Sequence, residues 1–114
     1  MEIAAQAKYV RRGPRKARLV ADAVRGMGVE QALAYLQFLP NHAAHDVAKV
    51  IKSAAANAEH NYELDPGQLR VKYLQVDEGA RIRRFRPRAR GTAHSYVHRT
   101  CHITAVVEDA AAQE

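Results

Sequence analysis

LRVKYLQVDEGARIRRFRPRARGTAHSYVHRTCHITAVV, residues 69–107, decides the fold of this chain of 114 residues. Apolar and polar residues alternate at both of its ends, which is typical of strands that bury one face in a sheet. Between these ends, residues 81–100 hold seven arginines and no acid. Because a strand follows the arginine segment, both ends of the segment are attached to the sheet. A disordered loop of about 20 residues would be unusual inside a compact domain, and the pattern therefore predicts an antiparallel hairpin.

The alternation of apolar and polar residues identifies the inward face of each of the two flanking strands. In residues 69–77 the apolar parity changes near Tyr73, which indicates a β-bulge. The two apolar sets are Leu69, Val71 and Tyr73, then Leu74 and Val76. After the arginine segment, the predicted inward set is Val97, Cys101, Ile103, Ala105 and Val107. The predicted outward set is His98, Thr100, His102 and Thr104. We expect the chain to fray after Val107.

The arginine segment is predicted to form an extended arm. In an extended chain, one face holds Arg84, Arg86, Arg88 and Arg90, and the other holds Phe85, Pro87, Ala89 and Gly91. About ten residues lead from residue 79 to the tip, and at roughly 3.3 Å each they reach about 30 Å. An isolated hairpin with so little apolar surface is marginal in water. We therefore expect the arm to be ordered only where a polyanion surrounds it.

Three helices are predicted before these strands. Proline suits the first position of a helix, so the first helix begins at Gly13-Pro14 and ends near Gly26. The second covers residues 29–38, and the third runs from a cap at Asn41 to about His60. The first helix buries Ala17, Val20, Ala21 and Val24; the second buries Val29, Ala32, Leu33 and Leu36; the third buries Val47, Val50, Ile51, Ala54 and Ala58.

The element order predicts one α+β domain over residues 1–114, in which three helices pack on a small antiparallel sheet and a long β-hairpin protrudes. The globular body is expected to comprise residues 1–78 and 101–110. The extended basic hairpin is expected at about residues 79–100. No internal repeat or linker divides the chain into two cores.

Positive charge is concentrated in two segments of a chain whose formal net charge is +6. Without the seven arginines of residues 81–100, eleven basic residues face twelve acids. A second cluster, residues 8–18, holds six basic residues and no acid. Asp22 can pair with Arg18 or Arg25 on the first helix, which leaves Arg11, Arg12, Arg15 and Lys16 less compensated. Such segregation indicates a polyanionic partner.

Folded RNA fits the pattern better than duplex DNA. The sequence has no helix-turn-helix or zinc-finger spacing, and two phenylalanines without tryptophan give no stacking platform for single strands. Guanidinium groups that contact phosphate read shape rather than base sequence. One cysteine, no secretory signal and no apolar run of about 18 residues favour a cytoplasmic protein that does not enter a membrane.

Catalytic and metal chemistry is not expected. His94, His98 and His102 recur every four residues, but in a strand such residues lie about 13 Å apart, too far to share an ion. Cys101 and His102 point to opposite faces of the strand, so they form no nucleophile pair. The alternative from another class is a small nucleic-acid-processing enzyme that uses His94 or His98 with an arginine clamp. No cofactor is expected.

Five blocks of the sequence resemble, in order, the family of bacterial large-subunit ribosomal protein twenty-two. They are PRKARLVADAVRG (14–26), VAKVIKSAAANAEHN (47–61), VDEG (76–79), RFRPRARG (84–91) and RTCHITAVV (99–107). The resemblance implies a structural constituent of the ribosome that binds large-subunit rRNA, assists assembly and lines the nascent-peptide exit tunnel with its hairpin. The implied partners are this rRNA, other large-subunit proteins and the nascent polypeptide, without homo-oligomerisation.

Charge and resemblance together give the candidate residues. The candidate rRNA-binding residues are Lys8, Arg11, Arg12, Arg15, Lys16, Arg18, Arg25, Arg81, Arg83, Arg84, Arg86, Arg88, Arg90, His98 and Arg99. The candidate tunnel tip consists of Arg88, Ala89, Arg90, Gly91 and Thr92. The chain departs from the family's usual residues at Gly13, Ala80, Thr92, His98 and Cys101. Thr92 and His98 stand where basic residues are common, which lowers the charge of the returning strand.

Overall fold

A computed structural model describes residues 2–109 of the chain, and residues 1 and 110 of the predicted body lie outside this range. The elements are β1 (Glu2–Val10), α1 (Pro14–Val24), α2 (Val29–Gln37), α3 (His42–Tyr62), β2 (Leu69–Glu78), β3 (Ile82–Pro87), β4 (Ala93–His98) and β5 (Cys101–Asp109). Short 3₁₀ turns lie at Pro66–Gln68 and Ala89–Gly91.

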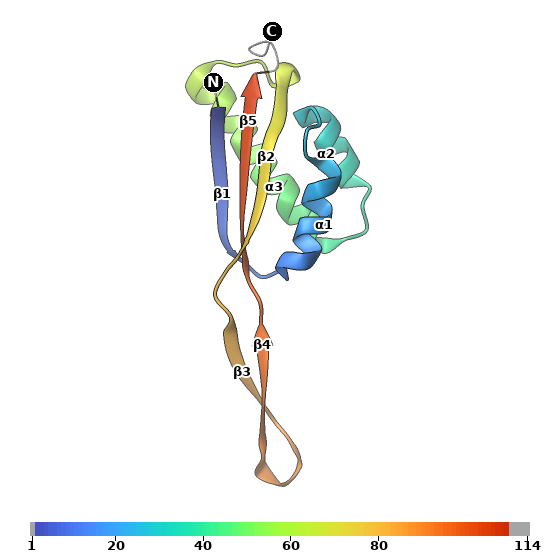
Figure 1. Cartoon of the computed structure of the whole chain (residues 1–114), viewed down its shortest axis with the longest axis vertical. Coiled ribbons are helices and arrows are strands. Elements are labelled where there is room, and N and C mark those ends of the chain that lie inside the picture. Colours follow the sequence, from blue (N-terminus) through green and yellow to red (C-terminus); the bar gives the residue numbers. More distant parts are fainter. Residues whose placement is uncertain (1, 110–114) are drawn as a thin grey trace.

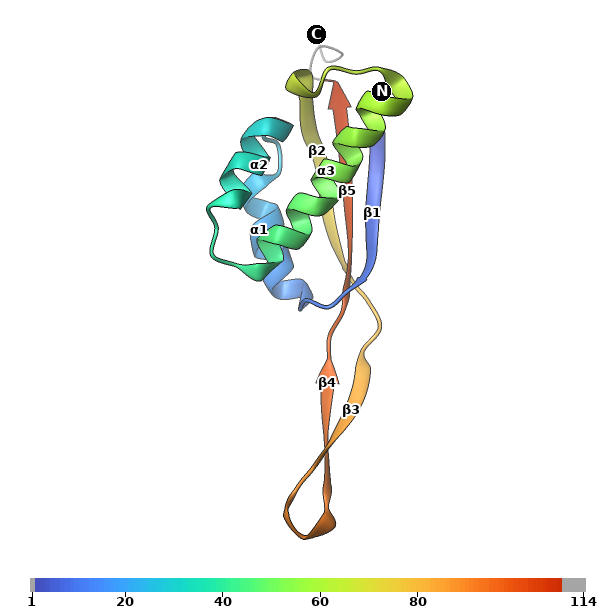
Figure 2. The same ribbon diagram turned by 180° about the vertical axis from the view of Figure 1, so that it is seen from behind.

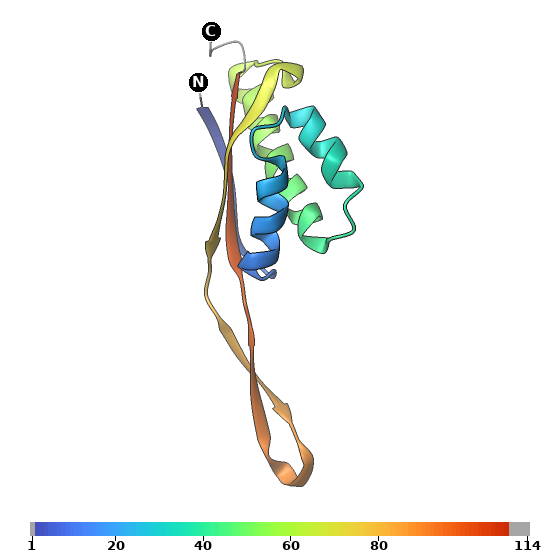
Figure 3. The same ribbon diagram turned by 45° about the vertical axis from the view of Figure 1, so that its right-hand side comes forward.

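The body is a three-stranded antiparallel sheet with helices on one face. The strand order is β1-β5-β2, so the last strand occupies the centre. The helices cover one face of this sheet and leave the other face open (Figures 1 and 3). The predicted α+β class is confirmed. Among residues 2–109, no helix combines the length and the apolar character that a membrane crossing needs.

The core lies between the sheet and the helices. On β5, Cys101, Ile103, Ala105 and Val107 are fully buried, as the alternation predicts. On β2 the register shifts between Val71 and Tyr73, and buried positions resume at Leu74, so the predicted bulge is confirmed. Val97 was placed wrongly: it lies on β4 and is 47% exposed, because the inward alternation of the body does not continue into the hairpin.

The helices pack through the predicted stripes with two corrections. The buried residues of α1 are Ala17, Val20, Ala21 and Val24. Small alanines at Ala54 and Ala58 are fully buried on α3, which packs against β1 and β5. Leu33 on α2 is only partly buried, because it lies at the rim of the core. Asn41 occupies the cap position of α3 with extended backbone, but its side chain makes no capping hydrogen bond.

Two further corrections concern the ends of the chain. No strand was predicted before the first helix, whereas β1 pairs with β5 from Glu2 to Val10 and includes the candidate Lys8. The chain does not fray directly after Val107, since Glu108 and Asp109 complete β5 and Glu108 is buried. Glu108 pairs with strands on both sides and Asp109 pairs with Leu69 of β2, which holds these last residues in place.

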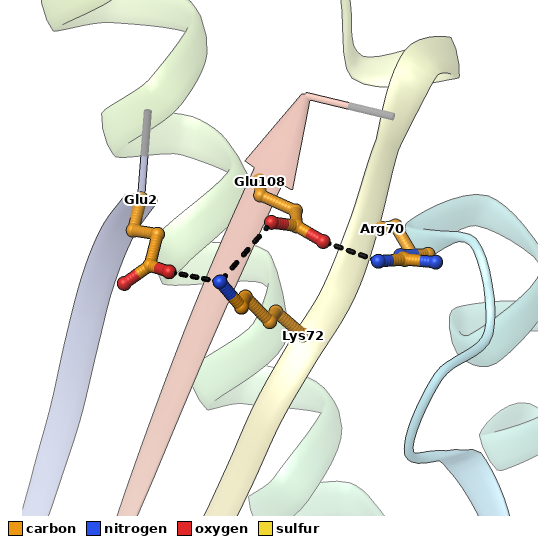
Figure 4. Close-up of polar contacts among 4 residues, drawn as sticks. All are labelled: Glu2, Arg70, Lys72 and Glu108. Atoms are coloured by element: carbon orange, nitrogen blue, oxygen red, sulfur yellow. Dashed lines mark hydrogen bonds and ion pairs between the residues drawn. The ribbon is translucent and has the colours of Figure 1, made fainter. Parts of the chain in front are cut away.

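Four charged side chains form a network on the open face of the sheet (Figure 4). Lys72 on β2 pairs with Glu2 on β1 and, at 3.6 Å, with Glu108 on the central strand. Arg70 on β2 donates to the other carboxylate oxygen of Glu108. The hydrogen bond from Arg70 is the main cause that lowers the pKa of Glu108, and the bond to Glu2 is the main cause that raises the pKa of Lys72.

The remaining two strands leave the body together. β3 and β4 pair antiparallel from Ile82 opposite His98 to Pro87 opposite Ala93. They extend beyond the end of the sheet that lies opposite the start of β1 and the end of β5 (Figures 1 and 2). The molecule is therefore long and thin, with extents of 66 × 26 × 20 Å.

Candidate nucleic-acid interface

The hairpin is anchored to the body by a buried threonine. Thr100 is 1% exposed, and its Oγ1 donates a 2.6 Å hydrogen bond to the carbonyl oxygen of Ala80. The N–H of Gly79 donates to the carbonyl oxygen of Thr100 at 2.9 Å. The predicted outward position of Thr100 is therefore wrong. The hydroxyl is needed inside, where it satisfies a carbonyl group at the point where the two strands leave the sheet.

Beyond this anchor, the hairpin has two unlike faces. Residues directly opposite one another in an antiparallel pair share a face. One face presents Ile82, Arg84, Arg86, His94, Tyr96 and His98, and the other presents Arg83, Phe85, Pro87, Ala93, Ser95 and Val97. On the first face the Arg86 guanidinium lies over the Tyr96 ring, 4.8 Å from its centroid. This stacking orients one arginine without neutralising its charge.

The tip is a closed turn. The N–H of Arg88 donates to the carbonyl oxygen of Thr92 at 2.7 Å, and the Thr92 hydroxyl donates to the carbonyl oxygen of Ala89 at 3.0 Å. Arg90 and Gly91 have positive φ angles of 63° and 75°. The predicted alternation of faces therefore holds through Pro87 and fails beyond it, because residues 88–92 form a turn rather than an extended strand.

Most arginines of the hairpin form no ion pair within residues 2–109. Within residues 2–109, the ion pair of this segment joins Arg81 to Glu78 at 2.9 Å, at the base. The side chains of Arg83, Arg84, Arg86, Arg88 and Arg90 are exposed, and in the described part of the chain they pair with no carboxylate. Five like charges on a two-stranded arm repel one another until an external anion approaches.

The body contributes further basic residues, and some of them already form hydrogen bonds or ion pairs within the protein. Arg25 bridges Asp22 and the carbonyl oxygen of Leu74, each at 2.6 Å. Arg18 donates from Nε to the carbonyl oxygen of Val76 at 3.0 Å. These two candidates tie the α1 segment to the edge strand β2, and both residues are exposed.

The cluster at the start of α1 is less uniform than predicted. Arg12 was expected to be among the less compensated cations, but its Nε donates to Asp46 of α3 at 2.8 Å. These two residues lie far apart in the sequence, so their ion pair could not be predicted from local spacing. Arg11, Arg15 and Lys16 are exposed, and no ion pair with them is found within residues 2–109.

Two basic hollows flank the first turns of α1. The base hollow lies toward the hairpin and includes Arg15, Arg18, Arg81 and Arg99 in its lining, together with Asp22 and Glu78, which pair with Arg25 and Arg81. The loop hollow lies toward the start of α3 and includes Arg11, Arg12, Asn41 and His42. Cations from the body and from the hairpin therefore form one continuous basic end of the molecule. Lys8 is exposed on β1 and lines neither hollow.

The histidines and the cysteine do not assemble a reactive centre. Nδ1 of His102 accepts a 3.0 Å hydrogen bond from the backbone N–H of Tyr9, so this histidine is used to fasten β1 to β5. Cys101 is fully buried, and burial is the main cause that raises the pKa of its thiol. In the described residues, no group of three or more histidine, cysteine or acidic side chains is placed to hold a metal ion.

Two surface residues were missed by the sequence analysis. Tyr96 lies opposite Arg84 across the hairpin and stacks with Arg86. A tip at residues 88–92 already implies this pairing, but the strand register was not worked out from it. Leu19 is 68% exposed and lines both basic hollows. Its signal in the sequence was its position outside the buried stripe of α1.

Comparison with known proteins agrees with this geometry. The family model for ribosomal protein L22p/L17e matches residues 5–108. The chain belongs to the ribosomal protein L22p/L17e family. The family is one of structural ribosomal proteins, which gives no support to the enzyme alternative.

Individual relatives match over nearly the whole chain. The large ribosomal subunit protein uL22 of Desulforamulus reducens is 53% identical over 109 residues, 96% of each chain. That of Chloroflexus aggregans is 50% identical over 109 residues, again 96% of each. That of Lactobacillus gasseri is 53% identical over 105 residues, 92% of this chain and 90% of the relative. The similarity therefore includes both the body and the hairpin.

Proposed function

We propose that this chain is a structural component of the large ribosomal subunit in the cytoplasm, and that it binds large-subunit rRNA through its basic end. Family membership supports the ribosomal role. The observation that carries the binding mode is the set of five exposed hairpin arginines that meet no carboxylate within residues 2–109. Phosphate groups supply the missing counter-charge, and guanidinium groups bind them with short, directional hydrogen bonds.

The proposed contacts fall into three groups by their present partners. The hairpin arginines and Arg99 bind phosphate along the arm and at its base. Arg11, Arg15 and Lys16 bind on the body with their charge uncompensated, together with Lys8 on β1. Arg12, Arg18, Arg25 and Arg81 contribute through donors that their protein partners leave free. His98 contributes as a weaker donor, since its ordinary pKa lies near neutrality.

The hairpin is proposed to pass between rRNA segments and to line the nascent-peptide exit tunnel with residues 88–92. Its thin, extended shape and unneutralised charge suit a crevice between phosphate backbones. The turn at its end exposes Ala89, Gly91 and Thr92 beside two arginines, so the tip can face a passing polypeptide as well as RNA. We also propose that the chain acts as a single copy, contacts other large-subunit proteins, assists assembly and needs no cofactor.

Reconstitution of large subunits from rRNA and proteins, with this chain as the only source of its family, tests the proposal. The variant pair is Arg86→Ala with Arg88→Ala, on the hairpin, against Lys49→Ala with Lys52→Ala, on α3. Both doubles remove two exposed positive charges. We expect the arginine double to enter subunits poorly and the lysine double to enter as the wild type does. Equal incorporation of the two doubles would contradict the proposed site.

A further inference from the structure

One residue, Leu19, stands out on the basic end of the molecule. It is 68% exposed, and the buried stripe of α1 is complete without it. A single exposed leucine is ordinary on a protein surface, so its exposure alone means little. Its position is the informative feature, because it lines both the base hollow and the loop hollow.

The two hollows share three lining residues, which form the ridge between them. These are Gly13, Lys16 and Leu19, spaced by three residues and so stacked along one side of α1. The ridge therefore carries one cation and one apolar side chain. On both of its sides the linings hold arginines, with Arg15 and Arg99 toward the hairpin and Arg11 toward α3. The base hollow also holds two carboxylates, each paired with an arginine, and its cations outnumber them.

This arrangement, in which a ridge with one lysine and one leucine lies between two groups of arginines, selects among RNA shapes. One phosphate backbone can occupy one hollow, and then the second hollow and Leu19 stay unused. Two backbones, one in each hollow, bring sugars and base edges over the ridge between them. In A-form RNA the minor groove is wide and shallow and displays riboses, whereas the major groove is too deep and narrow for side chains to read. A low ridge on the side of a helix matches the minor groove.

We propose that α1 binds the minor groove of a double-helical rRNA segment, with the two phosphate backbones in the two basic hollows and Leu19 packed against the riboses between them. This inference rests on the proposed function, since it assigns the RNA shape that the body recognises. In this arrangement Leu19 recognises the shape of the RNA, because an apolar side chain makes no favourable contact with a charged phosphate group. The arginines around it supply affinity without selecting between single and double strands.

The first test compares two apolar truncations on binding to complete large-subunit rRNA. Leu19→Ala removes the ridge side chain, and Phe38→Ala is the matched control, since Phe38 is 83% exposed at the end of α2 and lines neither hollow. Alanine favours helix at least as well as leucine, so the fold is retained. We expect Leu19→Ala to weaken binding roughly five- to tenfold, as partial burial of a leucine implies, with the salt dependence unchanged. Phe38→Ala should bind as the wild type does.

The second test locates the RNA strands. An iron chelate that generates hydroxyl radicals is attached at Ala23→Cys, an exposed position one turn beyond Leu19, and the natural Cys101 is fully buried and stays unlabelled. We expect cleavage on both strands of one rRNA helix, on the two sides of a single minor groove.

Each result has a defined meaning. Cleavage confined to one strand, or a Leu19→Ala variant that binds no more weakly than Phe38→Ala, overturns the minor-groove assignment. The proposed function survives that outcome if the wild type binds rRNA and the Arg86→Ala, Arg88→Ala double binds less well. A wild-type protein that fails to bind large-subunit rRNA overturns both.

Discussion

The hydroxyl of Thr100 donates a 2.6 Å hydrogen bond to the carbonyl oxygen of Ala80, and this bond joins the two chain segments at the base of the hairpin. The neighbouring Gly79 leaves no room for a side chain: a Cβ there would lie 2.5 Å from Oγ1 of Thr100 and 3.3 Å from Cε1 of His102. A buried hydroxyl and a missing side chain thus fix where the arm leaves the body.

Replacing Gly79 with alanine is expected to destabilise the protein. Overpacking of this kind costs on the order of 1–3 kcal/mol, and loss of the Thr100 hydroxyl in Thr100→Ala costs about 1–2 kcal/mol. In the double variant the closest clash is absent, so its loss of unfolding free energy should be smaller than the sum of the two single losses. Urea denaturation of all four proteins measures this cycle. If the two losses of unfolding free energy are additive, Gly79 and Thr100 do not compete for the same space.

Glu108 is expected to make stability depend on pH in acid. Its pKa is lowered from 4.5, chiefly by the hydrogen bond from Arg70, so its contribution is present above that ordinary value and is lost as the pH falls through the lowered pKa. Glu108→Gln should be less stable than the wild type at about pH 7, and the difference in unfolding free energy should narrow as the pH falls below 4.5. Urea titrations at several pH values check this. A gap independent of pH would indicate lost packing rather than lost charge.

The affinity for rRNA is expected to fall steeply with salt. If about seven phosphates are neutralised, the slope of log affinity against log salt concentration is about −5 to −6, and each contact contributes about 0.7–0.9. Arg86→Ala with Arg88→Ala should therefore reduce the slope by roughly 1.4–1.8. Filter binding over a salt series measures both values. Lys49→Ala with Lys52→Ala serves as control, and an equal change in its slope would place the contact elsewhere.

Excision of the hairpin is expected to leave the body folded. Every buried residue of the described chain lies outside residues 80–99, so replacing residues 83–95 with a short turn removes no core side chain. The shortened protein should melt cooperatively, near the wild-type temperature, in circular dichroism. A broad transition in the shortened protein would mean that the arm supports the body.

The sequence predicted the elements whose patterns were strong and local. The bulge near Tyr73, the stripe of α1 and the buried face of β5 follow from periodicity alone. β1 was not predicted, because its inward residues after Ile3 are Ala5 and Ala7, which favour helix as readily as strand.

The sequence predicted which basic residues belong to the site, but it predicted less well how these residues are arranged. The hairpin arginines could be predicted from the sequence, because a run of basic residues without acids is visible without a structure. The Arg12–Asp46 pair and the buried hydroxyl of Thr100 depend on contacts between distant segments, which periodicity does not report. Leu19 was passed over because its importance comes from the two hollows beside it, and these form only when α1, the start of α3 and the hairpin base meet.

Crosslinking from the tip tests the central claim most directly. A photoreactive probe is attached at Thr92→Cys, with Cys101 buried and unreactive, and the protein is built into translating ribosomes. The account predicts crosslinks to rRNA of the tunnel wall and to the nascent polypeptide. Crosslinks only to rRNA or proteins on the outer surface of the subunit would contradict it.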